Sequence, residues 1–358
     1  MTTRTRTCAI VGTGAIAGAH AEAIAQAGDR ARLIGVVDVE AERAARFAAE
    51  WDVPAFASLA ELLDAERPDL VHLCTPPGSH LPLALECLAA GASPLVEKPP
   101  VLSLAELDRL RAAEAGAGAP VATVFQHRFG SGAVRLRRLV AEGALGRPLL
   151  ASADTLWFRD DEYFTVPWRG SWELEGGGPT MGHGIHQFDL LLSILGPWSS
   201  VSAVAARQAR DTETEDVSAA LVRFDSGALA TVVNSLVSPR QTSRLRFDFE
   251  LGTVDLEHLY GYSDTNWTFT PAPGLVTGAW TGEADTPSGH TAQFTAVLDA
   301  LDAGTPPPVS TADTRTTVEF IAAVYASAFT GRTISRGEIT EGHPFYGSMA
   351  GSGAPWST

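Results

Sequence analysis

The sequence of 358 residues predicts an α/β plus α+β protein with two domains. The first is expected to contain a doubly wound parallel sheet, and the second a large open, mostly antiparallel sheet. Short apolar runs alternate with amphipathic segments over residues 1–126, and a glycine-rich turn follows the first run. Longer β-rich runs with little helix between them follow residue 148. We therefore place the domains at 1–126 and 127–358.

Five apolar runs predict the strands of the first domain, and amphipathic segments predict its helices. The predicted strands are Cys8–Val11, Leu33–Val37, Leu70–Cys74, Leu95–Val96 and Val121–Phe125. The predicted helices are Ala15–Ala27, Ala41–Trp51, Ser79–Ala90 and two that open at capping boxes, Ser58–Glu61 and Ser103–Glu106. Apolar strands separated by helices pair in parallel and are covered on both faces.

The second domain has a different texture. Seven of the eight tryptophans follow residue 148, and residues 201–260 contain several long β segments separated by turns. Successive strands with little helix between them indicate antiparallel pairing. Helices are predicted after Thr180, over 291–301 and over 314–329.

The composition excludes several classes of partner. The chain carries 42 acidic and 26 basic residues, and its net charge of −16 disfavours nucleic acid and anionic membranes. No apolar run approaches the length of a transmembrane helix, and the first residues do not resemble a signal peptide, so a cytoplasmic location is expected. The three cysteines are too few for a disulfide framework and are expected as buried thiols.

The glycine-rich turn indicates a dinucleotide site. Gly12 would permit the tight turn, Gly14 would let the backbone approach a pyrophosphate, and Ala17 is small enough for close packing of helix on strand. Asp38 ends the second strand, where a carboxylate accepts hydrogen bonds from an adenosine ribose and repels a 2′-phosphate. The pattern predicts NAD rather than NADP, with a helix cap as the alternative role of Asp38.

Lys98 is the only lysine among the 26 basic residues and directly follows the fourth predicted strand. An ammonium group can release its proton once it is desolvated, whereas a guanidinium cannot. Ligands of doubly wound sheets bind beyond the carboxyl ends of the strands. Lys98 is therefore a candidate proton donor and acceptor, unless one lysine has simply survived in an arginine-rich chain.

Taken together, these segments resemble the Gfo/Idh/MocA family, which includes glucose-fructose oxidoreductase and inositol dehydrogenase. The resemblance rests on the glycine turn, Asp38, Thr75-Pro76-Pro77…His80, Glu97-Lys98-Pro99, Phe125-Gln126-His127-Arg128-Phe129, Trp168-Arg169-Gly170 and Gly176–Asp189. It implies a Rossmann domain followed by an α/β domain with a large open sheet. It also implies hydride transfer between NAD(P) and a carbinol of a sugar or cyclitol, with Lys98 and His186 at the catalytic centre.

On this basis we expect the following contacts and no metal. The expected cofactor contacts are Gly12, Gly14, Ala15, Ile16, Asp38, Thr75, Pro76, His80, Glu97, Lys98 and Gln126. The expected substrate contacts are Lys98, Arg128, Tyr163, Trp168, Arg169, His183 and His186. His80 lies beside the presumed cap Ser79, so a structural role is favoured over a catalytic one.

Three interpretations of the second-domain histidines remain open. His183, His186 and Asp189 are spaced i, i+3 and i+6, which places both histidines on one face of a continuous helix. His186 shares a proton with Lys98 or orients the substrate hydroxyl, or all three residues bind a metal, or both histidines are structural. The resemblance favours the first interpretation.

Two further features bear on the substrate. Many members of the family that the chain resembles carry an acidic or amide residue where this chain has Gly182, so either His183 takes over that contact or the substrate differs. Aromatic residues cluster between 157 and 172, and Tyr163 offers both a ring face and a hydroxyl to a sugar. Such clusters are nevertheless more often core than binding surface.

Two other functions remain as alternatives to net dehydrogenation of the substrate. An NAD-dependent glycoside-cleaving enzyme would oxidise a sugar transiently, eliminate across it and reduce it again. A cofactor-sensing protein would keep the fold without catalysis. In each case we expect a homodimer or homotetramer formed through the C-terminal sheet, because one uncovered apolar face would otherwise stay exposed.

Overall fold

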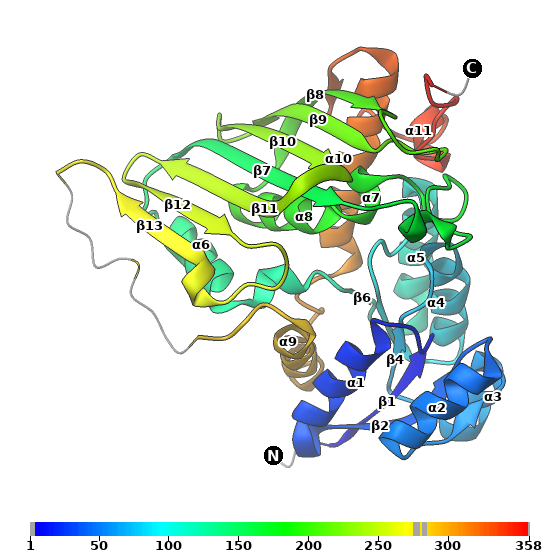
Figure 1. The fold of residues 1–358 in the computed structure, drawn as a ribbon. Helices are drawn as coiled ribbons and strands as arrows, with labels where there is room; N and C mark the ends of the chain where they lie inside the picture. The colour runs from blue at the N-terminus through cyan, green and yellow to red at the C-terminus, as the bar shows by residue number, and fades with distance from the viewer. Residues whose placement is uncertain (1–3, 275–279, 281–284, 357–358) are drawn as a thin grey trace. The chain divides into compact units, whose positions relative to one another are not determined.

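The computed structural model describes residues 4–274, 280 and 285–356, and it divides into two units (Figure 1). Unit 1 comprises 1–101, 106–124 and 290–314; unit 2 comprises the rest of the chain. The break after Val124 falls two residues before the predicted boundary. The segment His290–Thr314, which we predicted with the second domain, packs with unit 1.

Unit 1 contains a six-stranded parallel sheet in the order β3-β2-β1-β4-β5-β6, which confirms the predicted doubly wound sheet. The strands are β1 Arg6–Val11, β2 Ala31–Val37, β3 Ala55–Phe56, β4 Leu70–Leu73, β5 Ser93–Val96 and β6 Ala122–Thr123. The main helices are α1 Ala17–Gln26, α2 Ala41–Trp51, α3 Leu59–Glu66, α4 His80–Ala89, α5 Leu104–Ala117 and α9 His290–Ala303. Only β3 was not predicted, because two residues form no recognisable apolar run.

Local signals explain how these helices begin. The hydroxyl of Ser58 accepts a hydrogen bond from the Glu61 backbone N–H at 3.2 Å, and the Glu61 carboxylate accepts one from the Ala57 N–H at 3.0 Å. This confirms the capping signal at α3. The helix ends at Glu66, and the capping residue that follows, Arg67, has a left-handed φ of 46°, as is common at C-termini.

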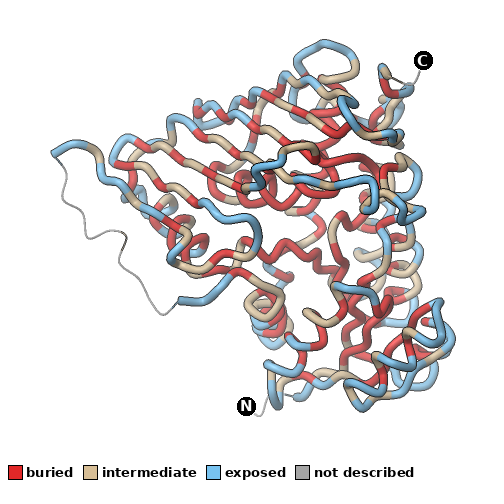
Figure 2. Tube along the Cα trace, in the orientation of Figure 1, coloured by how far each residue is buried: buried red, intermediate tan, exposed pale blue. Residues whose placement is uncertain are grey.

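One apolar cluster holds unit 1 together. Ile10, Val36 and Leu70 of the sheet pack with Ile24 of α1 and Phe294 of α9, and all five are buried. Figure 2 shows buried residues along the strands of this sheet. Helix α9 thus completes the helical layer beside α1, although most of unit 2 separates the two helices in the sequence.

Unit 2 contains an eight-stranded sheet in the order β13-β12-β11-β7-β10-β9-β8-β14; among its described strands, β10 and β7 pair in parallel and all other pairs are antiparallel. The strands are β7 Pro148–Phe158, β8 Trp198–Ala206, β9 Val217–Phe224, β10 Leu229–Ser235, β11 Val237–Phe249, β12 Gly252–Glu257, β13 Trp267–Pro271 and β14 Ile334–Ser335. The main helices are α6 Ser131–Ala141, α7 Pro179–Gly182, α8 Ile185–Leu195, α10 Thr311–Thr330 and α11 Pro344–Gly347. The large, mostly antiparallel sheet is as predicted.

The two faces of this sheet differ. Helices α7 and α8 pack on one face. The other face carries Leu221, Leu229 and Leu150, which are 65%, 44% and 49% exposed. The register places all three on that face, because Leu221 pairs with Thr231, two residues from Leu229, and Leu229 pairs with Leu150.

The segment after Thr180 is not one continuous helix, so the predicted helical spacing of His183 and His186 is wrong. Helix α7 ends at Gly182, and α8 begins at Ile185. The Gly184 N–H donates to the carbonyl of Pro179 at 2.7 Å, which closes a turn between the helices. Glycines on both sides of His183 weaken helix continuity, and this explains the break.

Other expectations concern thiols and membranes. Cys8, Cys74 and Cys87 are buried free thiols, as predicted, and burial raises the pKa of Cys87 to about 12. Across the described part of the chain, no helix has both the length and the apolarity to cross a membrane.

Candidate functional site

The glycine turn of unit 1 has the geometry of a phosphate-binding loop. Gly12 has a φ of +88°, and its N–H donates to the carbonyl of Val37 at 2.8 Å. A Cβ on Gly12 would lie 2.9 Å from the backbone of Cys74, so only glycine fits. A Cβ on Gly14 would meet no atom within 4 Å, which leaves its backbone open to a ligand.

Asp38 closes this turn. Its carboxylate accepts hydrogen bonds from the Thr13 N–H at 2.7 Å, the Thr13 hydroxyl at 2.9 Å and the Glu40 N–H at 2.9 Å. Arg43 binds both oxygens, at 2.9 Å through Nε and 2.5 Å through Nη2. Burial would raise the pKa of Asp38, but these hydrogen bonds, led by that of Arg43, hold it well below its usual value.

His80 joins the two loops that follow β4 and β5. Its Nε2 lies 2.8 Å from the carbonyl oxygen of Thr75, and its Nδ1 lies 2.8 Å from that of Pro99. The ring is fully buried, and burial lowers its pKa, although both carbonyls oppose that effect. The ring nitrogens therefore support the loops, which agrees with the structural role favoured for His80.

Glu97 and Lys98 follow β5 at the carboxyl edge of the sheet. Glu97 is buried, and its Oε2 accepts a hydrogen bond from the Lys98 backbone N–H at 3.0 Å. His20 and His290 both contact its Oε1, at 3.1 and 2.9 Å. Burial would raise the pKa of Glu97, but the two histidines outweigh burial and hold it well below the usual range. Lys98 is half-buried beside this anion.

In unit 2, His186 lies within a group of aromatic rings. The ring centroid of His186 is 4.9 Å from that of His127 and 5.7 Å from that of Tyr260. Gln126, an expected cofactor contact, donates a hydrogen bond to the Tyr260 hydroxyl at 2.6 Å. His127 was not among the predicted site residues, although it stands inside the segment that carried the resemblance.

Asp189 pairs with Arg128 rather than with the two histidines of its own segment. The guanidinium of Arg128 donates to both Asp189 oxygens at 2.6 Å, in the bidentate geometry typical of strong ion pairs. Burial raises the pKa of Asp189, and Arg128 opposes this. The predicted substrate contact Arg128 thus orders the start of unit 2 against α8.

Tyr163 and His183 form a second polar group in unit 2. The Tyr163 hydroxyl lies 3.3 Å from Nε2 of His183, and burial raises the pKa of Tyr163 to about 12. The guanidinium groups of Arg169 and Arg159 lie 4.4 and 5.2 Å from the centre of the Tyr163 ring. Arg169 also stacks on Trp168 at 3.8 Å. Arginine side chains therefore pack against the rings of this aromatic cluster.

The space beside Gly182 faces Glu175, which the sequence reasoning missed. A Cβ on Gly182 would lie 3.4 Å from Oε1 of Glu175. The same carboxylate accepts hydrogen bonds from Arg169 and from the Gly170 N–H, each at 2.7 Å. A buried carboxylate thus stands next to the position that lacks a side chain.

Glu215 anchors the start of α7. It accepts hydrogen bonds from the Gly178 and Thr180 N–H groups, both at 3.1 Å, and from the Tyr325 hydroxyl at 2.8 Å. Burial raises its pKa to about 7, although these donors favour the charged form. No local pattern marks it, because its partners lie 35 to 110 residues away.

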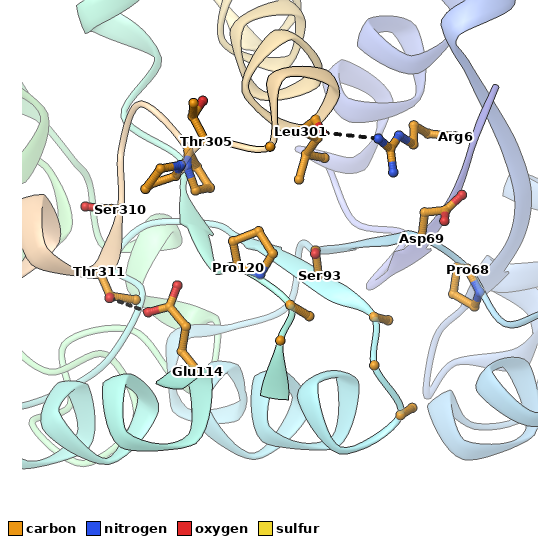
Figure 3. Close-up of a pocket in the computed structure, with 18 of the residues that line it drawn as sticks. Arg6, Pro68, Asp69, Ser93, Glu114, Pro120, Leu301, Thr305, Ser310 and Thr311 are labelled. Carbon is orange, nitrogen blue, oxygen red and sulfur yellow. Dashed lines mark hydrogen bonds between the residues drawn. The ribbon is translucent and has the colours of Figure 1, made fainter. Parts of the chain in front are cut away.

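Unit 1 also contains a cavity of about 930 Å³ (Figure 3). Its lining includes Arg6, Asp69 and Ser93, which stand at the beginnings of β1, β4 and β5. It therefore opens at the amino edge of the parallel sheet, whereas ligands of doubly wound sheets bind at the carboxyl edge.

The predicted residues therefore fall into two groups. Unit 1 brings together the glycine turn, Asp38, Thr75, His80 and the Glu97–Lys98 pair at one edge of its sheet. The remainder are in unit 2: Gln126, Arg128, Tyr163, Trp168, Arg169, His183 and His186. Because Lys98 and His186 belong to different units, their pairing stays a prediction.

Two protein-family models match the chain. Residues 6–125 match the model described as "Oxidoreductase family, NAD-binding Rossmann fold", and residues 133–255 match the "GFO/IDH/MocA C-terminal domain". Both the expected Rossmann domain and NAD as the cofactor of that fold are confirmed by these matches.

Individual relatives are similar over different lengths. The chain is 30% identical to D-glucoside 3-dehydrogenase of Escherichia coli over 60% of this chain, and it spans only 61% of that relative. It is 26% identical to D-apiose dehydrogenase of Paraburkholderia graminis, over 86% of this chain and 83% of that protein. The crystal structure of WlbA dehydrogenase from Bordetella pertussis, in complex with NADH and UDP-GlcNAcA, is 27% identical and has a TM-score of 0.84, covering 93% of this chain and 99% of that one.

Proposed function

Because the chain belongs to the Gfo/Idh/MocA family of oxidoreductases, we propose that it transfers a hydride between a sugar or cyclitol carbinol and NAD. The relatives support this proposal, since those just named include dehydrogenases of a glucoside and of apiose. The observation that carries it is the position of the single lysine at the carboxyl edge of the same parallel sheet whose first strand leads into the glycine turn.

The residues of unit 1 fit a dinucleotide. The open space at Gly14 and the start of α1 would receive the pyrophosphate, since helix N-termini attract anions. Asp38 would accept hydrogen bonds from the adenosine ribose, which requires that Arg43 release it; the Arg43 side chain is 42% exposed and has room to move. When bound, NAD supplies an acceptor for the hydride.

Lys98 takes the hydroxyl proton of the substrate as the carbinol is oxidised, and returns it in the reverse direction. Glu97 fixes the backbone of Lys98 through the 3.0 Å hydrogen bond from its N–H. His186 shares the proton or orients the hydroxyl, and His127 and Tyr260 hold its ring in place. These roles agree with the intact Lys98 and His186, which a mere cofactor sensor would not need.

We propose that polar groups of unit 2 determine the substrate specificity. His183 and Tyr163 offer a hydrogen-bonding pair, and Glu175 presents its carboxylate where Gly182 leaves space. Hydroxyl groups of a sugar or cyclitol match such a set of donors and acceptors. The arginine-covered ring of Tyr163 favours contact through its hydroxyl over stacking on its face.

We also propose that the chain self-associates through the open face of the unit 2 sheet. Leu150, Leu221 and Leu229 lie on adjacent strands and share that face, so they form an apolar surface of the kind that a second copy covers.

A spectrophotometric screen of sugars, cyclitols and glycosides with NAD and NADP tests the activity. Accumulation of NADH with at least one polyol is expected. Cleavage of a glycoside without accumulation of NADH would replace net dehydrogenation by transient oxidation and elimination. Tight NAD binding without turnover of any compound would favour a sensor.

A further inference from the structure

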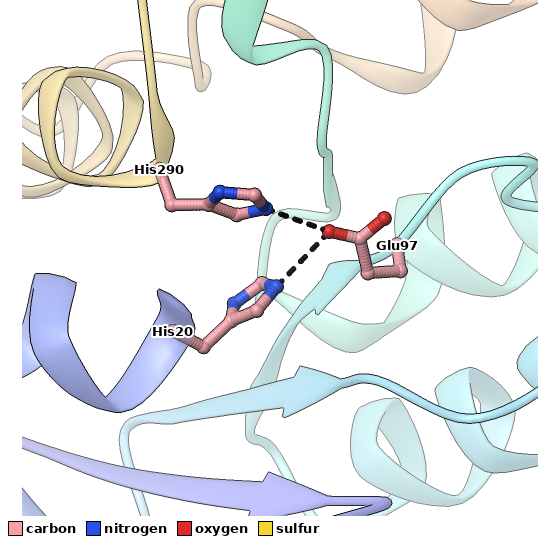
Figure 4. Close-up of side chains that lie close together, drawn as sticks. All are labelled: His20, Glu97 and His290. Atoms are coloured by element: carbon pink, nitrogen blue, oxygen red, sulfur yellow. Dashed lines mark hydrogen bonds and ion pairs between the residues drawn. The ribbon is translucent and has the colours of Figure 1, made fainter. Parts of the chain in front are cut away.

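Three side chains from distant parts of the chain meet inside unit 1 (Figure 4). His20 lies on α1, Glu97 follows β5, and His290 is the first residue of α9. Nε2 of His20 lies 3.1 Å from Oε1 of Glu97, and Nε2 of His290 lies 2.9 Å from the same oxygen. The proposed hydride transfer gives His20 and His290 no role.

We propose that His20, Glu97 and His290 form a binding site for a divalent transition-metal cation of the zinc class. Two imidazole nitrogens and one carboxylate oxygen are a ligand set that such ions favour, with a fourth position left for water. This inference goes beyond the proposed function and does not depend on it.

The spacing of the ligand atoms suits one ion. The ligand atoms of these three residues all lie within 4.8 Å of one another. Zinc binds nitrogen and oxygen at about 2.0–2.2 Å, so neighbouring ligands of a tetrahedral site are separated by roughly 3.3 Å. The two nitrogen–oxygen distances of 3.1 and 2.9 Å therefore need to open by only a few tenths of an ångström.

Burial also favours a cation at this point. The side chains of His20, Glu97 and His290 are 1%, 8% and 11% exposed. A buried carboxylate is stable when it is paired or coordinates a metal, and a bound cation would compensate its negative charge.

His72 supplies the second layer that metal-binding histidines usually have. Its Nδ1 lies 2.9 Å from Nδ1 of His20, which fixes the His20 ring with Nε2 directed at Glu97.

An ion here would link α1, the end of β5 and the start of α9. These elements are distant in sequence, and the link would hold the loop that carries Lys98. Because the unfolded chain lacks the assembled site, binding would stabilise the folded form.

The test uses the full chain, stripped with a chelator and titrated with Zn²⁺ or Co²⁺. One ion per chain is expected to survive dialysis, together with a rise in melting temperature. The Co²⁺ form should show visible d–d bands without the intense sulfur-to-cobalt charge-transfer band, because no ligand is a thiolate.

His290→Gln is the matched variant, since glutamine keeps an N–H donor for Glu97 but lacks the ring nitrogen. It should weaken binding by more than the 10- to 100-fold that loss of a second-layer partner costs. His258→Gln, at an exposed histidine of unit 2, should bind like the wild type.

If the wild type retains no more ion after dialysis than His290→Gln does, the three side chains are held by hydrogen bonds alone and bind no metal. That result would overturn the proposal. Cobalt spectra with sulfur ligation would overturn it too, and that readout needs no variant to fold. Neither outcome bears on NADH formation, so failure here is distinct from failure of the proposed activity.

Discussion

The Nδ1 atom of His80 lies 2.8 Å from the carbonyl oxygen of Pro99, and its other ring nitrogen lies equally close to the carbonyl of Thr75. One buried imidazole therefore ties together the loop that carries the expected cofactor contacts Thr75 and Pro76 and the loop that carries Lys98, the proposed proton acceptor.

Replacing His80 with Leu keeps the core filled but removes the ring nitrogens that contact the carbonyls of Thr75 and Pro99, so at least one carbonyl loses its hydrogen-bond donor. A loss of about 1–3 kcal/mol in the free energy of unfolding is expected, because unsatisfied buried polar groups cost that much. Affinity for NAD should fall as well. Urea unfolding and a fluorescence titration with NADH measure both effects, with His258→Leu as the exposed control. Unchanged stability and unchanged affinity would refute the bridging role.

Arg43 is expected to tune the choice between NAD and NADP. It occupies both oxygens of Asp38, the carboxylate that we assign to the adenosine ribose. Arg43→Ala frees that carboxylate and removes a cation able to accept a 2′-phosphate, so the ratio of kcat/KM for NAD over NADP should rise. Asp38→Ala should lower the ratio. A ratio that moves the other way in either variant would contradict this assignment.

Glu215 should make stability depend on pH. Burial raises its pKa to about 7 from an ordinary value of 4.5, so the folded state binds the proton more tightly than the unfolded state. Its contribution is complete below pH 4.5 and is lost as the pH rises to about 7. The shift corresponds to about 3 kcal/mol.

The free energy of unfolding of the wild type, measured relative to Glu215→Gln, should therefore fall by that amount over this pH window. Glu42→Gln, at a carboxylate whose side chain is 96% exposed, serves as control. Parallel pH curves for the wild type and Glu215→Gln would disprove the linkage.

Leu221→Asp should disrupt self-association. The side chain is 65% exposed in the single chain, and a charge buried at an interface is strongly unfavourable. Sedimentation should show a smaller species than the wild type, with the far-ultraviolet circular dichroism unchanged. If the wild type itself sediments as a monomer, the proposed self-association is wrong.

Much of the fold was predictable because its signals are local. The Ser58 capping box, the glycine turn and the short apolar strands each act over a few residues, and the structure has them where the sequence places them. The histidine segment differed, since the glycines on both sides of His183 interrupt a helix that spacing alone would extend.

Long-range contacts were beyond sequence reasoning. His20 and His290 are 77 and 193 residues from Glu97, and their meeting depends on the packing of α9 beside α1. The pairing of Arg43 with Asp38 was missed for another reason: arginine at that spacing is equally typical of a solvated helix face. Glu175 belongs to no recognisable sequence motif. Its candidate role follows only from its contact with Arg169 and from the space at Gly182, which the structure shows.

The most direct test of the account compares Lys98→Arg with the wild type in a single-turnover measurement of NADH formation on a substrate found by the screen. Arginine keeps the positive charge but does not release its proton near neutrality. The account predicts that the hydride-transfer rate falls by about 10²- to 10⁴-fold while NAD affinity changes little. A variant that forms NADH at nearly the wild-type rate would contradict proton transfer by Lys98.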